Sequence, residues 1–319
     1  MATAMKPGWS NPSTILFASE IPANEKALSF AVAQAREFGA HLILFHAYDT
    51  MVVATSETSG LRYYDASAAA RIEVHQLEPL AAKIQAEGVS CEIVVRPGLA
   101  ADQILHFLKQ RPVDRIVMGT HSPGPIGKLL VGSVAEAVLR TSPVPVYIVG
   151  PDVADARYRN YATGTILCAV SLNETSYVVA EFAAALAAKH NARLVLQHVI
   201  KPQERAQVLA GRTIDDMESD LSAMIPEEYR DKVTVQTIAV PGDPTEELLY
   251  QARAQQADLV VLGAQGASAF AAVTRQGVVY KVLAHSHCPV LTLSPALLAE
   301  CGVKSTHEHA AEVFLAGVF

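Results

Sequence analysis

Apolar and polar residues alternate along this chain in blocks typical of strands followed by helices. Short runs that are almost wholly apolar predict buried strands at 14–19, 41–47, 90–96, 113–119 and 144–149. Between these runs, apolar positions recur at helical spacing, which predicts helices at 23–38, 66–87, 100–109 and from Gly132-Ser133 onward. Strands that are apolar on both faces and alternate with helices indicate a parallel sheet covered by helices.

The same pattern then repeats. A second set of predicted strands lies at 163–170, 191–199, 232–240, 257–266 and 286–294, with a helix at 174–190. The repeat predicts two complete βα units at 12–150 and 162–295, a boundary near 151–161 and a C-terminal extension at 296–319. The expected fold class is therefore α/β, with two tandem, doubly wound, five-stranded parallel-sheet domains of Rossmann-like type. The extension is expected either to form a helix packed across the body or to stay loose.

Composition and charge argue against nucleic-acid-binding and membrane proteins. The net charge of −7 and the scatter of Lys and Arg argue against nucleic acid and anionic membranes as partners. The N-terminal residues lack a signal-peptide core, and no apolar run approaches the ~18 residues that a membrane-spanning helix needs. Four cysteines without CxxC spacing are typical of a reducing compartment, so we expect a cytoplasmic protein.

The loop between the strand at 113–119 and the helix at Gly132 is the main candidate site. Gly119 ends the strand, and Ser133 with Glu136 three residues later predicts a capping box at the helix start. A glycine loop that faces a helix N-terminus is a physical anion site, suited to phosphate. The alternative interpretation is an ordinary strand–loop–helix joint with a well-capped helix.

These residues resemble the universal stress protein family, present as a tandem pair over roughly 12–150 and 162–295. The resemblance is carried by the first strands ILFA and ILCAV, the second strands LFHA and LQHV, and a G-x-x-G-x9-G-[ST] loop. The first copy reads Gly119 and Gly132-Ser133, with Ser122 in place of the second glycine. The second copy keeps Gly263 and Gly266 but has Gln276-Gly277 where the family has a Gly-Ser pair.

Family members with the complete motif bind ATP, so the resemblance implies an ATP-binding stress-response regulator or sensor, with Mg²⁺ able to accompany the nucleotide. Carried over residue by residue, it implies that the nucleotide contacts Ala18, Glu20, Ala47, Met118, Gly119, Ser122, Gly132, Ser133 and Val134. The matching but weaker set in the second copy is Val199, Leu262, Gly263, Gly266 and Gly277. Because the second copy has Ser171 where the first has Glu20, we expect the nucleotide in the first copy. The Cβ of Ser122 is expected to weaken that binding without abolishing it.

The family commonly dimerises through the last strand. In a tandem chain this implies an intramolecular pseudo-dimer that pairs 144–149 with 289–294, and it leaves open a further homodimer and an unknown protein partner.

Other residue groups point to no further chemistry. The pairs His285/His287 and His307/His309 lack Cys or Asp companions, so no metal site is predicted. His46 and His198 recur at matching positions in the second strands, which favours a shared structural role over catalysis. No nucleophile motif and no Walker A signature is present, so we expect no enzyme, or at most a weak ATPase. A nucleotide-free interaction module with degenerate pockets remains the alternative function.

Overall fold

In the computed structural model, which describes residues 6–48, 66–120, 132–154, 163–202, 211–263 and 277–301, strands and helices alternate as the sequence predicts. The strands of the first half are β1 (Thr14–Ala18), β2 (His41–Tyr48), β3 (Cys91–Pro97), β4 (Arg115–Gly119) and β5 (Val146–Val149). Those of the second half are β6 (Thr165–Ala169), β7 (Arg193–Ile200), β8 (Val235–Pro241), β9 (Leu259–Gly263) and β10 (Val290–Leu293).

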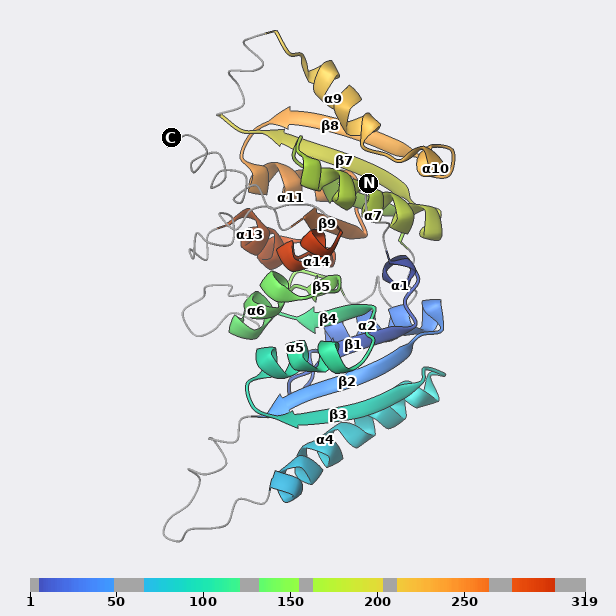
Figure 1. Ribbon diagram of the computed structural model, residues 1–319, viewed down its shortest axis with the longest axis vertical. Coiled ribbons are helices and arrows are strands. Elements are labelled where there is room, and N and C mark those ends of the chain that lie inside the picture. Colours follow the sequence, from blue (N-terminus) through green and yellow to red (C-terminus); the bar gives the residue numbers. More distant parts are fainter. Residues whose placement is uncertain are drawn as a thin grey trace, which may run out of the picture.

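These ten strands of the described residues form one continuous sheet. Its order is β3-β2-β1-β4-β5-β10-β9-β6-β7-β8, so the two halves follow one another along the long axis of the molecule (Figure 1). Within each half every pair is parallel, as the fold-class prediction requires. Between the halves β5 and β10 pair antiparallel, with Tyr147 opposite Leu291 and Ile148 opposite Val290. The α/β fold with two tandem units is confirmed, and the predicted pairing of 144–149 with 289–294 is present.

Helices cover both faces of this sheet. One face carries α2 (Glu25–Phe38), α4 (Ala66–Ala86), α7 (Glu174–His190), α9 (Ile214–Ala223) and the short α10 (Glu227–Arg230). The other carries α5 (Ala100–Gln110), α6 (Ser133–Thr141), α11 (Pro244–Ala254) and α13 (Val278–His285). Each face therefore has one core that is shared by the two halves. Among the described helices, none combines the length and the apolar character needed to cross a bilayer.

Both ends of the described chain pack where the halves meet. The short helix α1 (Pro7–Ser10) carries Trp9, which is 3% exposed and lies 6.3 Å from the ring of Phe182 in α7. After β10, the extension begins with α14 (Pro295–Glu300), and the Ser294 hydroxyl at its start donates to the Ser142 carbonyl of the first half. The first part of the extension is thus a packed helix, whereas 302–319 lies outside the described residues. No pattern in the sequence predicts the role of Trp9, because a single apolar residue among turn formers has no hydrophobic period.

A buried guanidinium lies in the same region. Arg115 is wholly inaccessible to solvent and donates to the Gln34 amide oxygen at 3.0 Å and to the Trp9 carbonyl at 2.7 Å. Its charged end also lies 4.9 Å from the ring of Phe38 and 5.0 Å from that of Tyr147, where ring faces attract a cation. Arg115 therefore links the N-terminal segment, helix α2 and strand β5.

His190 at the end of α7 lies beside this cluster, with its ring edge-on to Phe38 at 5.5 Å. Burial, followed by the positive charges of Arg115 and Lys189, lowers the pKa of His190 from 6.5 to about 4. The folded state therefore binds fewer protons than the unfolded state between these two pH values. The contribution of the neutral His190 ring to the unfolding free energy is fully present above pH 6.5 and is lost as the pH falls towards 4.

Replacement of this imidazole predicts a change in acid sensitivity. Between pH 7 and pH 4, the unfolding free energy of His190→Gln should fall by about 3 kcal/mol less than that of the wild type, because Gln cannot take up the proton. Urea unfolding followed by circular dichroism at several pH values measures this difference. Parallel pH profiles for the two proteins would show that His190 does not carry it.

Candidate functional site

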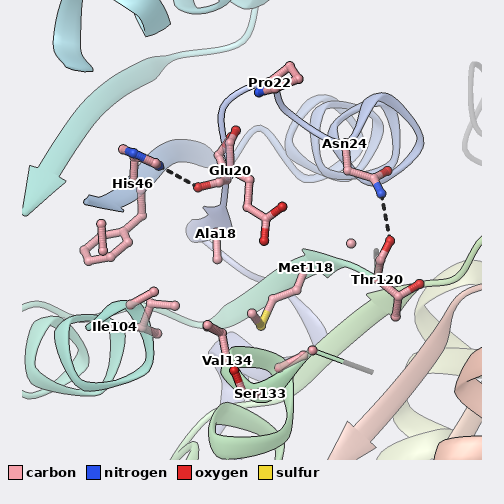
Figure 2. Close-up of a pocket in the computed structure, with 17 residues that line it drawn as sticks. Ala18, Glu20, Pro22, Asn24, His46, Ile104, Met118, Thr120, Ser133 and Val134 are labelled. Atoms are coloured by element: carbon pink, nitrogen blue, oxygen red, sulfur yellow. Dashed lines mark hydrogen bonds between the residues drawn. The ribbon is translucent and has the colours of Figure 1, made fainter. Parts of the chain in front are cut away.

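A pocket of about 610 Å³ opens at the carboxyl ends of β1, β2 and β4, beside the start of α6 (Figure 2). Its size is within the ~300–1,000 Å³ of typical small-molecule sites. It lies where the strand order turns between β1 and β4, the place where open α/β sheets bind their ligands. The lining residues are Ala18, Ser19, Glu20, Pro22, Asn24, Phe45, His46, Ala47, Ala100, Ile104, Met118, Gly119, Thr120, Gly132, Ser133, Val134 and Ala135.

The structure brings together most of the residues predicted for the first copy. Those that line the pocket are Ala18, Glu20, Ala47, Met118, Gly119, Gly132, Ser133 and Val134. Ser122 lies outside the described residues. Asn24 and Ile104 were not predicted, although each had a local signal: Asn24 precedes a helix as a cap, and Ile104 is apolar in the helix after the third strand.

One side of the pocket is apolar and the other is polar. Ala18, Ile104, Met118 and Val134 supply the apolar part, and Figure 2 shows the Glu20 carboxylate directed into the space above Ala18 and Met118. Among the lining residues, none is Lys or Arg. Among these residues, the groups that can donate hydrogen bonds to an anion are therefore backbone N–H groups and neutral polar side chains such as Ser133.

Helix α6 supplies such groups, but the predicted capping box at its start is wrong. The N-cap is Gly132, with extended backbone (φ −61°, ψ 155°) and no side-chain cap, so Ser133 is the first helical residue. The first intrahelical hydrogen bond runs from the Glu136 N–H to the Gly132 carbonyl. A capping hydroxyl belongs to the half-helical residue before the first turn, and Gly132 occupies that place. The N–H groups of Ser133, Val134 and Ala135 precede the first bond and face the pocket with the positive end of the helix dipole.

Glu136 bonds elsewhere than at the helix start. Burial, then the Glu136 charge and its hydrogen bond, raise the pKa of Tyr280 in α13 to about 12. The carboxylate that was expected to close a capping box instead links α6 to a helix of the second half.

The two matching histidines have the shared structural role that the sequence predicts. His46 Nδ1 lies 2.9 Å from the Ser19 carbonyl and His198 Nδ1 lies 3.2 Å from the Val170 carbonyl, at equivalent positions after the first strand of each half. Because a carbonyl only accepts, the hydrogen must be on Nδ1 in both rings. In the first half His46 Nε2 also faces the Glu73 carboxylate of α4 at 3.7 Å.

Of the residues predicted for the second copy, three lie at the matching strand ends and one lies at the matching helix start. Val199 and Leu262 are buried, Gly263 ends β9, and Gly277 is the N-cap of α13 (φ −66°, ψ 153°). Gly266 lies outside the described residues. Within the part of the molecule that the structure describes, metal-ligating side chains form no group of three or more.

One wall position distinguishes the two halves. In the first half Phe45 lines the pocket and its ring lies 5.3 Å from that of Phe107 in α5. Gln197 takes the equivalent place in β7 and is 1% exposed, and within the described ranges neither its amide nitrogen nor its amide oxygen has a hydrogen-bond partner. Leaving a buried polar group unpaired costs about 1–3 kcal/mol. The second half thus carries an energetic penalty where the first has a packed aromatic pair.

Removal of the Gln197 amide is therefore expected to stabilise the protein. Gln197→Met, which keeps length and shape, should raise the unfolding free energy by about 1–2 kcal/mol, measured by urea unfolding. The control is Gln251→Met at the half-buried position that matches Phe107, with an expected change within about 0.5 kcal/mol. A loss of stability in Gln197→Met would mean that the amide is satisfied by an ordered water.

Comparison with known proteins gives a consistent assignment. The family model described as the universal stress protein family matches residues 13–150 and 163–294. A universal stress protein of Mycolicibacterium smegmatis is 36% identical over 104 residues, which are 32% of this chain and 78% of that protein. Universal stress protein YxiE of Bacillus subtilis is 33% identical over 131 residues, which are 39% of this chain and 88% of that protein.

Solved structures show the same fold over nearly the whole chain. A universal stress protein from Archaeoglobus fulgidus matches with a TM-score of 0.68 at 20% identity, covering 90% of this chain and 97% of that chain. A functionally unknown protein from Pseudomonas aeruginosa matches with a TM-score of 0.60 at 18% identity, covering 93% and 98%. With two consecutive segments matched by one family model, this chain belongs to the universal stress protein family.

Proposed function

We propose that the protein binds an adenine nucleotide, ATP, in the pocket of its first half and acts as a stress-response sensor or regulator. The observation that carries this proposal is the start of α6, where three N–H groups without intrahelical acceptors face a pocket that also holds the Glu20 carboxylate. A helix N-terminus binds phosphate without a lysine.

The lining residues fit the three parts of such a ligand. The N–H groups of Ser133 to Ala135 and the exposed Ser133 hydroxyl would hold phosphate oxygens. The Glu20 carboxylate would accept hydrogen bonds from ribose hydroxyls, and the apolar side chains of Ala47 and Met118 would contact the base. Mg²⁺ would be held mainly by phosphate oxygens and water, since Glu20 is the single carboxylate among the lining residues.

The pocket favours binding over turnover. Among the described residues that line it, the titratable side chains are Glu20 and His46. One nitrogen of the His46 ring is held by the Ser19 carbonyl, and the other faces Glu73. A general base must reach the attacking water. Glu20 is assigned to the ribose and His46 to its structural contacts, so neither is placed to act as that base. We therefore propose a nucleotide binder with at most slow hydrolysis.

The four cysteines form no disulfide, which supports a reducing, cytoplasmic setting.

The first half is the proposed site because the second half has no acid at the position of Glu20 and has a buried amide at the position of Phe45. Ser171 replaces Glu20, and its backbone N–H donates to the Ser176 hydroxyl at 2.9 Å. Gln197 replaces Phe45.

Matched substitutions at the two helix starts test this proposal. Both Gly132 and Gly277 have extended backbone that accepts Asp, which is itself a good N-cap, so neither variant should unfold its helix. Gly132→Asp should weaken ATP binding at least about tenfold, because a carboxylate then opposes the phosphates, whereas Gly277→Asp should bind as the wild type does.

Isothermal titration of the full chain with ATP measures both variants. No binding by the wild type at millimolar ATP would overturn the proposal in favour of a nucleotide-free interaction module. Loss of binding in Gly277→Asp alone would place the nucleotide in the second half.

A further inference from the structure

One side chain, Asn24, connects the start of α2 to the end of β4. Its amide oxygen accepts the Ala27 N–H at 3.1 Å and so caps the helix. Its amide nitrogen donates to the Thr120 carbonyl at 3.1 Å, across 96 positions of sequence (Figure 2). Asn24, Gly119 and Thr120 all line the pocket. The same amide therefore fixes a helix start and the first residue after a strand.

Asn24 also explains why residue 119 has no side chain. A Cβ added to Gly119 would lie 2.6 Å from Cγ, 2.7 Å from Nδ2 and 2.8 Å from Cβ of Asn24, closer than real Cβ contacts allow. Gly119 has no positive φ that would itself demand glycine. The glycine is required here by the amide packed against it.

In the second half a different residue packs against the equivalent glycine, Gly263. A Cβ on Gly263 would lie 2.6 Å from Cγ2 of Val179, an apolar side chain of α7. Retention of a glycine at both positions therefore reflects packing against the helix that follows the first strand. In the first half the packed group is in addition a hydrogen-bond donor.

We propose that Asn24 is a positioning residue of the pocket, which holds the Gly119–Thr120 backbone where the anionic part of the ligand is bound. This inference rests on the proposed nucleotide function. The Thr120 N–H donates to the Val149 carbonyl at 3.1 Å, so the Thr120 backbone is held to β5 through its N–H and to Asn24 through its carbonyl. Without the Asn24 hydrogen bond, one of these two restraints on the Thr120 backbone is lost. Ligand binding must then order this backbone itself, and that cost lowers the affinity.

Asn24→Ser separates positioning from capping. Serine is as good an N-cap as asparagine, is uncharged, and is too short to reach the Thr120 carbonyl. The full-length variant should bind ATP about five- to tenfold more weakly, the loss expected for one hydrogen bond. Its affinity for adenosine should change less than twofold, because adenosine lacks the phosphates. The matched control is Asn173→Ser at the N-cap of α7, which should leave both affinities unchanged.

Titration with ATP and with adenosine, alongside circular dichroism to verify folding, decides the question. Unchanged ATP affinity in Asn24→Ser, or equal losses for ATP and adenosine, would overturn the positioning role while leaving the proposed function intact. Failure of the wild type to bind ATP would instead overturn both.

A second pair of variants tests the same contact from the other side. Gly119→Ala should displace the Asn24 amide and reproduce the selective loss of ATP affinity, whereas Gly263→Ala should disturb Val179 and leave ATP binding as it is in the wild type. Selective loss in Gly263→Ala, or none in Gly119→Ala, would contradict the assignment.

Discussion

Antiparallel pairing of β5 with β10 is the constraint on which the rest of the structure depends. It converts two five-stranded parallel sheets into one sheet and so removes an exposed edge from each half. The Thr292 hydroxyl adds a hydrogen bond to the Val146 carbonyl at 3.2 Å within this pair. Because the sheet is continuous across the two halves, each of its faces has one core that extends over both. The packing of α1, α14 and the Arg115 cluster follows from that continuity.

The elements with a clear period were predictable from the sequence. The strand TILFA is buried at its three central positions, and Gly39 ends α2 with φ of 62°, as the apolar run and the glycine stop indicate. The repeat predicted the second half because each copy carries the same periods. Eight residues that the family resemblance implied also line the pocket of the first half, since the ends of parallel strands meet at one edge of the sheet.

Long-range and single-residue features were not predictable in this way. The Asn24 tether joins residues 96 positions apart, and no local pattern encodes it. Arg115 was part of a predicted strand, but its burial beside Trp9 and Tyr147 depends on the arrangement of both halves. The prediction of a capping box at Ser133 was wrong because two neighbouring residues can both cap a helix, and in the structure the N-cap is Gly132.

The two halves share one fold and differ in what surrounds the strand ends. Gly119 and Gly263 both pack against the helix after the first strand, yet one contacts an amide and the other a valine. Phe45 and Gln197 differ in the same way: Phe45 belongs to an aromatic pair, whereas Gln197 is a buried amide without a hydrogen-bond partner in the part of the chain that the structure describes. Shared glycines are therefore weak indicators of a shared ligand. The nucleotide is therefore proposed for the first half alone.

The number of ATP molecules bound per chain tests this division most directly. Equilibrium dialysis of the full-length protein against radiolabelled ATP, carried to saturation, should give one molecule per chain. Two equivalent molecules per chain, or none, would contradict the account.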